Sequence, residues 1–440
     1  MTYRRSTLEN GIRVVTDRRA HSRSVSIGVV VEAGPFSEEP RRGGLAHLCE
    51  HMLFQGTSSR TALDIARIMD HAGGSVGGFT SRDYTNYYAV VTDDYATFAL
   101  DLLGDVFLNP VFPQASIDSE KHAIRCEIQA RLDDPEHRVH DLLKSHVWSG
   151  HPLGRAITGT IDSIDTLDRE ALIYFLHQHY LPERIVIAGA GHIEHDDFVA
   201  HVRDAFWRML PSGAPTPRRR AADFHPGLII DENPTRQAYF AIGLAAPAYT
   251  AENRYAVHVL TRLLGGGLSS RLFRLLRDEH GMVYEIHASY QAYRDAGLIV
   301  IEGSTLPQNV VPVVATICQE LIDLGTWQRP IDEEELVRAK AQLTAQTILS
   351  GEDSHSSMAR LATQEIYFGR YLGETELLDA IDRVDLTALE HLSRHELRLD
   401  TTPKALTVST PDASSIEAEA DALRDLLGMH VPTESHRTLF

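Results

Sequence analysis

Hydrophobic and polar residues follow two different patterns along the chain, and these patterns predict both strands and helices. Residues 84–91 (YTNYYAVV) and 298–303 (LIVIEG) are short and rich in β-branched or aromatic residues, which is typical of strands. Residues 97–107 (TFALDLLGDVF) and 333–349 (EEELVRAKAQLTAQTIL) are longer and have helical patterns. The sequence therefore predicts an α+β protein in which sheets pack against helices.

The pattern occurs twice, which indicates an internal duplication. Residues 24–34 (SVSIGVVVEAG) resemble residues 237–247 (QAYFAIGLAAP), and the GTSSR that begins at Gly56 resembles the GLSSR that begins at Gly267. Between the two copies, residues 211–227 are rich in Pro, Gly and small residues, a composition typical of a linker. We therefore predict two α+β domains of one topology, with these boundaries: a first domain over 1–215, a linker over 216–226 and a second domain over 227–440.

Composition restricts the class of protein further. The chain is 43% hydrophobic and 23% charged, as expected of a compact protein, and no apolar run is long enough to cross a bilayer. The formal net charge of −19, with no evident basic face, argues against a nucleic-acid partner. The N-terminus lacks the hydrophobic region of a signal peptide, and three cysteines are too few for a disulfide framework. We therefore expect a cytoplasmic protein, with Cys49 and Cys126 as buried structural thiols.

The segment His47 to His51 (HLCEH) is typical of a helix-borne zinc site. Positions four apart lie on the same face of a helix, so His47 and His51 can bind one ion. Glu50 lies beside them and could take a proton from a water molecule whose pKa the zinc ion lowers to about 7. The apolar stretch GLAHLCEHMLF (44–54) predicts a short buried helix. If both histidines were ordinary core residues, Glu50 would be buried without a partner, which is costly.

A catalytic zinc ion of this kind commonly takes a third ligand from a carboxylate on another helix. Residues 118–132 (DSEKHAIRCEIQARL) are the best candidate, because their acidic start suits the N-terminus of a helix. Glu120 and Glu127 are two helical turns apart and therefore share a face.

The stretch GGLAHLCEHMLFQGT, followed by SEKHAIRCEIQ, closely resembles the pitrilysin/insulinase family of zinc metallopeptidases, especially the mitochondrial-processing-peptidase-like branch. Three further segments extend the resemblance over nearly the whole chain: TLENGIRVVTD, HPLGRAITGT and GGLSSRLFRLLRDEHGMVYEIHASY. The resemblance implies His47, His51 and Glu127 as the ligands of one Zn²⁺ per chain. It also implies Glu50 as the general base, with Glu120 orienting or electrostatically supporting the site.

The resemblance also implies residues that contact the substrate. Arg277 and Tyr284 match an arginine and a tyrosine that hold the substrate carbonyl and stabilise the tetrahedral intermediate. The substrate backbone is expected to pair with an edge strand at Gly77, Gly78, Phe79 and Thr80. Where the family usually has Asn-Ala, this chain has Gly77-Gly78, which would loosen the strand and remove a side-chain amide.

The second copy has lost the metal motif. The repeat aligns Glu50 with Thr261 and His51 with Arg262, and only His47 keeps a histidine counterpart, His258. A second alignment pairs Glu120 with Glu335 and Glu127 with Gln342. Only the first half is therefore expected to bind the metal.

We interpret the chain as a zinc metalloendopeptidase that acts on short or unfolded peptides inside a chamber, of which one chain supplies half. In the resembling family the chamber closes when two such chains meet, so the partner is either a second copy or a metal-free homologous chain. Two alternatives follow. One is a protease dedicated to the maturation of a precursor peptide, and the other is a non-catalytic core or assembly subunit, which the intact motif disfavours.

Overall fold

The computed structural model describes residues 2–213 and 221–429. Within these residues it divides into two compact units. Among the described residues, the first unit draws on the ranges 2–131, 151–213 and 344–378, and the second draws on 132–150, 221–343 and 379–429. Each half of the chain therefore gives one segment to the unit formed mainly by the other half. The predicted domains 1–215 and 227–440 are continuous and do not include this exchange, and the predicted linker 216–226 lies partly outside the described residues.

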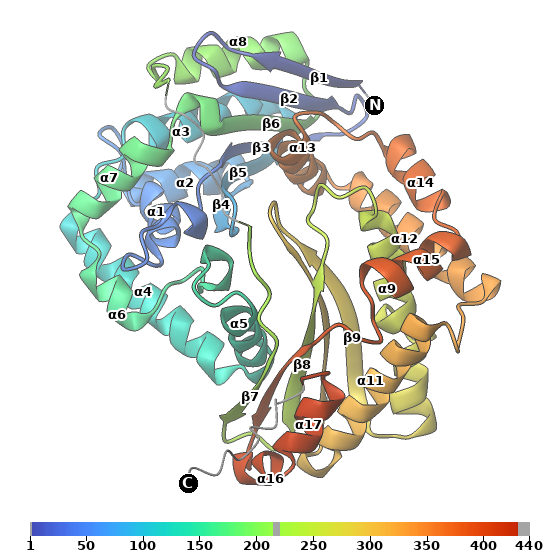
Figure 1. Ribbon diagram of the computed structural model, residues 1–440. Helices are drawn as coiled ribbons and strands as arrows, with labels where there is room; N and C mark the ends of the chain where they lie inside the picture. Colours follow the sequence, from blue (N-terminus) through green and yellow to red (C-terminus); the bar gives the residue numbers. More distant parts are fainter. Residues whose placement is uncertain (1, 214–220, 430–440) are drawn as a thin grey trace. The chain divides into compact units, whose positions relative to one another are not determined.

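The first unit contains a six-stranded sheet in the order β1-β2-β6-β3-β5-β4 (Figure 1). Neighbouring strands are antiparallel, except for the parallel pair β2 and β6. The central strand β3 is buried along nearly its whole length, as its apolar run SVSIGVVV requires, whereas β4 lies at the edge. The strands are β1 (Thr2–Thr7), β2 (Arg13–Arg18), β3 (Ser24–Val31), β4 (Ser75–Thr80), β5 (Thr85–Thr92) and β6 (Ile185–Gly191).

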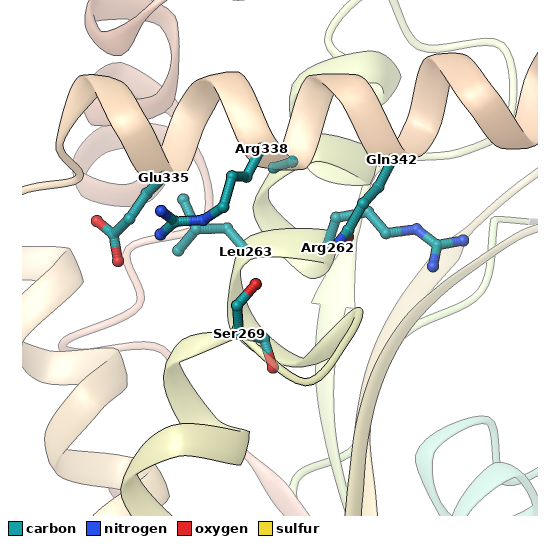
Figure 2. Close-up of a pocket in the computed structure, with 8 residues that line it drawn as sticks. Arg262, Leu263, Ser269, Glu335, Arg338 and Gln342 are labelled. Atoms are coloured by element: carbon teal, nitrogen blue, oxygen red, sulfur yellow. The ribbon is translucent and has the colours of Figure 1, made fainter.

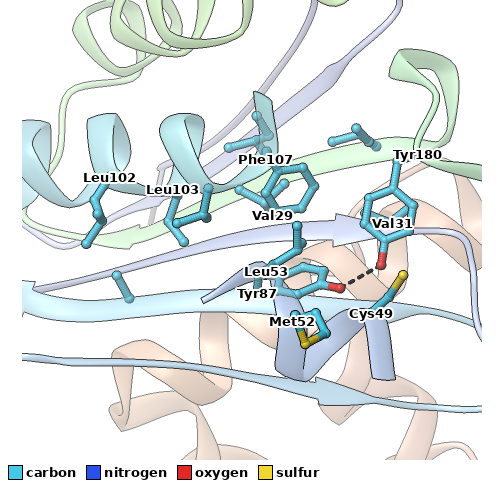
Figure 3. Packing of buried hydrophobic residues seen from close by; sticks show 14 of the residues in the cluster. Val29, Val31, Cys49, Met52, Leu53, Tyr87, Leu102, Leu103, Phe107 and Tyr180 are labelled. Atoms are coloured by element: carbon cyan, nitrogen blue, oxygen red, sulfur yellow. Dashed lines mark hydrogen bonds between the residues drawn. The ribbon is translucent and has the colours of Figure 1, made fainter. Parts of the chain in front are cut away.

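Helices from the first half of the chain cover one face of this sheet. Their apolar side chains join those of the strands in one core, and Figure 3 shows a part of it in which Phe107, Tyr87 and Tyr180 pack together. The hydroxyl groups of Tyr87 and Tyr180 lie 2.6 Å apart and satisfy each other inside this core. The helices are α1 (Leu45–Leu53), α2 (Ala62–Ala72), α3 (Ala96–Leu108), α4 (Gln114–Asp133), α6 (Ile161–Thr166), α7 (Arg169–His179) and α8 (His195–Phe206).

The other face of the sheet is covered by helix α13 (Ser354–Phe368), which comes from the second half of the chain (Figure 1). Met358, Leu361 and Ile366 of this helix pack against apolar residues of β2, β3 and β6. The contact is close, because a Cβ atom at Gly28 would lie only 2.2 Å from the sulfur of Met358. Helix α13 therefore buries the second apolar face of β3, which would otherwise contact water.

The second unit contains a five-stranded sheet in the order β7-β11-β8-β10-β9. Its only parallel pair among the described strands is β7 and β11. Helix α5 (Pro135–Val147), from the first half of the chain, packs on β8 and β11, and Leu143 contacts the position of Gly243. The strands are β7 (Gly227–Glu232), β8 (Ala238–Ala246), β9 (Val283–Ala292), β10 (Gly297–Thr305) and β11 (Ala405–Thr410).

The remaining helices belong mainly to the second half of the chain. Two of them, α12 and α14, continue past the division between the units. They are α9 (Arg254–Gly265), α10 (Arg271–Phe273), α11 (Val310–Thr326), α12 (Glu333–Glu352), α14 (Glu374–Asp382), α15 (Leu386–His391), α16 (Ala413–Glu417) and α17 (Ala420–Leu426). Among the described residues, no helix is both long and apolar enough to cross a membrane.

The two sheets confirm the predicted duplication and fold class. The order β2-β6-β3-β5-β4 in the first unit matches β7-β11-β8-β10-β9 in the second, and each sheet has its parallel pair at the same place. The two segments that resemble each other in the sequence become the equivalent strands β3 and β8. The fold is α+β, with two mixed sheets that are each packed with helices.

The contact of α13 with the first sheet predicts that a cavity created between them lowers the stability of the protein. We expect Met358→Ala to destabilise the protein by about 2–5 kcal/mol, because Met358 is fully buried and its truncation leaves space between helix and sheet. Leu349→Ala is the control, because Leu349 is 69% exposed, and we expect it to change stability by less than about 0.5 kcal/mol. Unfolding in urea measures both values, and equal stability of the two variants would contradict this account of α13.

Candidate metal centre and active site

Helix α1 (Leu45–Leu53) carries the predicted motif, and a buried carboxylate holds its N-terminus. The Oε1 atom of Glu38 accepts a hydrogen bond from the backbone N–H of Ala46 at 2.8 Å, and Oε2 accepts one from Gly44 at 3.2 Å. These N–H groups have no partner within the helix, and the carboxylate also suits the positive end of the helix dipole. Burial nevertheless dominates and raises the pKa of Glu38 to about 7. No sequence pattern indicates this role of Glu38, because Glu38 lies outside the helix that it caps.

The three predicted ligands lie together. Ligand atoms of His47, His51 and Glu127 are all within 4.8 Å of one another, and this is the one such group found in the described part of the chain. The Nε2 atom of His47 lies 3.6 Å from Oε2 of Glu127, which is too long for a hydrogen bond. Two ligands of one tetrahedral zinc ion, with bonds of about 2.0–2.2 Å, stand about 3.3–3.6 Å apart. The separation of His47 and Glu127 therefore fits two ligands of one zinc ion.

Glu120 contacts one of the histidines. Its Oε2 atom lies 2.8 Å from Nδ1 of His51, and its Oε1 atom accepts a hydrogen bond from Nε2 of Gln55 at 2.7 Å. When Nδ1 of His51 is held in this way, Nε2 is left to face an ion, an arrangement that is common for metal-bound histidines. The structure thus places Glu120, the predicted second acid, in contact with His51, and adds Gln55, which no pattern in the sequence indicates.

The burial of His47 favours the form of histidine that binds metals. Burial, followed by the charges of His51 and Arg131, lowers the pKa of His47 to about 3. The imidazole is therefore neutral at physiological pH, as a metal ligand must be. Its Nδ1 atom is buried and has no hydrogen-bond partner among the described residues.

The predicted general base, Glu50, is held by the edge strand. The hydroxyl group of Thr80 on β4 donates a hydrogen bond of 2.6 Å to Oε2 of Glu50. Burial raises the pKa of Glu50, and the hydrogen bond from Thr80 opposes this shift. A carboxylate with a raised pKa is better suited to accept and return a proton near neutral pH.

The two glycines of the edge strand have different surroundings. A Cβ atom at Gly78 would lie 2.7 Å from Cγ of Glu50, whereas one at Gly77 would lie 3.0 Å from the hydroxyl oxygen of Tyr88. Glycine at position 78 therefore gives the side chain of Glu50 the space that it occupies. Phe79 packs against the ring of Tyr84, with ring centroids 6.0 Å apart. The four predicted residues of the edge strand thus lie on β4, and two of them contact or adjoin the predicted base.

Arg277 and Tyr284 lie together in the second unit. The guanidinium carbon of Arg277 is 5.1 Å from the ring centroid of Tyr284 and 4.8 Å from that of Phe273. Arg277 lies on a π-helical turn (η5, Arg274–Glu279), and Tyr284 on β9 is 67% exposed. Irregular helical turns of this kind are frequent at functional sites. The structure therefore brings the predicted pair together and leaves the ring of Tyr284 accessible.

The second unit contains a counterpart of the site, and its described residues form no group of metal-binding side chains there. Figure 2 shows Arg262, Glu335 and Gln342 around one pocket of about 20 Å³. These are the residues that the alignment pairs with His51, Glu120 and Glu127. Arg271 binds Glu335 through hydrogen bonds of 2.7 and 2.6 Å, so an internal cation neutralises this acid. The same framework thus holds an ion pair where the first unit has its candidate metal-binding residues.

The two cysteines beside the site differ from each other. Cys49 is buried, as expected, but Cys126 is exposed, so the prediction for Cys126 was wrong. The physical reason is the face of α4 on which it lies. Ile117, Ile124 and Ile128 form the buried face of this helix, and Cys126 lies away from it.

A helix-borne pair of histidines with a neighbouring carboxylate base and a third carboxylate ligand defines the site of a zinc metallopeptidase. Comparisons with known proteins agree. Residues 13–161 match the family model of insulinase-type peptidases (peptidase family M16), and residues 166–343 match that of the M16 inactive domain. The chain belongs to the insulinase family of peptidases, M16. It is a zinc protease, and the reaction it catalyses is peptide hydrolysis.

Individual relatives cover nearly the whole chain. An uncharacterized zinc protease of Mycobacterium leprae is 36% identical over 397 residues, which span 89% of this chain and 88% of the relative. The uncharacterized zinc protease YmxG of Bacillus subtilis is 33% identical over 411 residues, or 93% of this chain and 99% of the relative.

Solved structures share the fold at low sequence identity. A peptidase M16 inactive domain from Pseudomonas fluorescens has a TM-score of 0.85 and 18% identity, covering 93% of this chain and 98% of that chain. A chain in Complex III2 from Candida albicans has a TM-score of 0.80 and 18% identity, covering 96% and 99%. Because the fold occurs in such different proteins, the function has to be argued from the site.

The contact of Thr80 with Glu50 predicts a loss of activity. We expect Thr80→Val, which keeps the shape of the side chain, to lower kcat/KM by about 10–100-fold, because a hydrogen bond to a charged group contributes about 1.5–3 kcal/mol. The zinc content should not change. The matched control is Thr92→Val, at the exposed end of β5, which should keep full activity. Equal activity of the two variants would rule out this role of Thr80.

The raised pKa of Glu38 predicts a pH dependence of stability. The folded state binds this proton more tightly than the unfolded chain does, so stability contributed by Glu38 falls as the pH rises from the ordinary pKa of 4.5 through about 7. Glu38→Gln does not titrate. The Tm of the natural chain minus the Tm of this variant should therefore be larger at pH 5 than at pH 8. Thermal unfolding at the two pH values measures it, and a constant difference would contradict the prediction.

Proposed function

We propose that the chain is a metalloendopeptidase that hydrolyses short or unfolded peptides inside an enclosed chamber, of which one chain supplies half. The observation that carries the proposal is the position of Glu50. Its carboxylate lies on the helix that carries His47 and His51, and it is hydrogen-bonded to the edge strand β4 through Thr80. A base between the candidate metal ligands and a strand edge is well placed to activate a water molecule that attacks a peptide lying along that edge.

The edge of β4 offers a binding mode for the peptide. Strand β4 pairs only with β5 among the described strands, so one side of its backbone is available to a further strand. A substrate that extends along Gly77 to Thr80 would form main-chain hydrogen bonds that do not depend on its side chains. This mode favours extended or unfolded peptides, because a folded segment has already used its backbone groups.

Each residue of the site would have its own role in the hydrolysis. His47, His51 and Glu127 would hold one zinc ion, which when bound acidifies water and polarises a carbonyl group. Glu50 accepts a proton from the attacking water and returns it to the leaving amine. Glu120 holds His51 in orientation through Nδ1. Arg277 and Tyr284 would donate hydrogen bonds to the oxyanion that develops on the substrate carbonyl.

We further propose that the active form contains two chains. Arg277 and Tyr284 of one chain would reach the zinc site of the facing chain. The partner is either a second copy or a metal-free homologous chain.

The test is to replace the base without disturbing the metal ligands. We expect Glu50→Gln to keep its zinc and to lower the cleavage of a mixed peptide library by about 10²–10⁴-fold, because the amide cannot accept the proton. Products are read by mass spectrometry and zinc by elemental analysis.

A matched control separates chemistry from folding. Glu170→Gln makes the same change at an exposed position on α7 and should cleave as the natural chain does. Full activity of Glu50→Gln would refute the proposed mechanism. If the natural chain binds zinc but yields no products from the library, self-sufficient activity is refuted, and a metal-free partner or a dedicated precursor becomes the expected requirement.

A further inference from the structure

The first unit contains an apolar cavity that is separate from the metal group. It has a volume of about 490 Å³, within the range of about 300–1,000 Å³ that is usual for small-molecule sites. Its walls come from the end of α3, the loop that follows, helix α7 and residues 208–210 after α8. The buried rings of Phe112 and Tyr180 form part of the lining, with exposed fractions of 2% and 7%.

The residues that line the cavity include one cation, Arg208, and no acidic side chain. Arg208 and His177 line it and are exposed. Arg208 forms no ion pair with an acidic side chain in the described part of the chain, and its guanidinium carbon lies 5.3 Å from the ring centroid of Trp207. The cavity thus combines an apolar interior with a guanidinium group that can bind a carboxylate.

We propose that this cavity binds amphipathic monocarboxylates, such as medium-chain fatty acids. The apolar chain would lie along Ile173 and Leu176 of α7, and the carboxylate would pair with Arg208. We expect a small molecule and not a partner protein in this cavity, because the lining is concave and includes buried rings. The charge complementarity selects a carboxylate over a neutral lipid or a cation.

Buried aromatic rings lie between the cavity and α1, the helix that carries His47 and His51. Phe107 and Tyr180 line the cavity, and their rings pack on Tyr87 at centroid distances of 5.0 and 6.2 Å (Figure 3). Tyr87 in turn packs on Phe54, the residue that ends α1, at 6.1 Å. Ligand binding is therefore expected to be separate from substrate binding.

The experiment is a calorimetric titration of the full zinc-loaded chain with decanoate below its micelle concentration at pH 7. We expect one decanoate per chain. Arg208→Gln should weaken binding by about fivefold, the effect of an exposed ion pair, and decanol should bind the natural chain more weakly by a similar factor. Ile173→Trp should place a larger ring where the apolar chain would lie and prevent binding, with Leu176→Trp as a second filling variant in case the first does not fold.

Two matched controls locate the binding. Arg203→Gln removes a charge on α8 that does not line the cavity, and Tyr174→Trp places the same ring at a neighbouring exposed position of α7. Both should bind decanoate as the natural chain does. Absence of decanoate binding would overturn the proposal, as would binding that survives both folded filling variants, since decanoate would then bind elsewhere, for example at the zinc ion. Equal affinity for decanol and decanoate, with no effect of Arg208→Gln, would overturn the assignment of a carboxylate.

Discussion

Helix α1 has to hold polar, ionisable side chains inside the protein, and the arrangement of the first unit depends on this constraint. Buried polar groups are tolerated when each has a partner. Glu38 satisfies the N-terminal amides of the helix, Thr80 binds Glu50, and Glu120 binds His51. Three separate segments of the chain therefore meet at one short helix, and its position is fixed by hydrogen bonds as well as by apolar packing.

The sheets impose a second constraint. A central strand such as β3, apolar on both faces, has to be covered on both sides. Helices from the same half of the chain cover one face, and α13 from the other half covers the second face, with Met358 packed at Gly28. The second unit uses α5 in the same way. Because each unit takes a helix from the other half of the chain, neither half carries all of its own core, which ties the stability of one unit to the presence of the other half.

The duplicated framework shows how one scaffold can hold different chemistry. Both units place a residue of a core helix opposite two residues of a long helix. In the first unit these are His51, Glu120 and Glu127, and in the second they are Arg262, Glu335 and Gln342. The backbone fixes which positions converge, and the side chains decide their chemistry: the first unit has a candidate metal-binding group, whereas in the second unit Glu335 pairs with a neighbouring residue, Arg271.

The sequence by itself determined the α+β class, the duplication, the helix 44–54 and the shared face of His47 and His51, because these depend on local periodicity and on spacings within single helices. Glu127 lies on another helix, and the resemblance to a family, not a spacing, implied it as the third ligand. It did not reveal Glu38 or Gln55, the space that Gly78 leaves for Glu50, the exposure of Cys126 or the exchange of α5 and α13. Each of these depends on which distant segments pack together. Only the tertiary structure decides them, because pairing partners and available space are properties of the folded contacts and leave no period or spacing in the sequence.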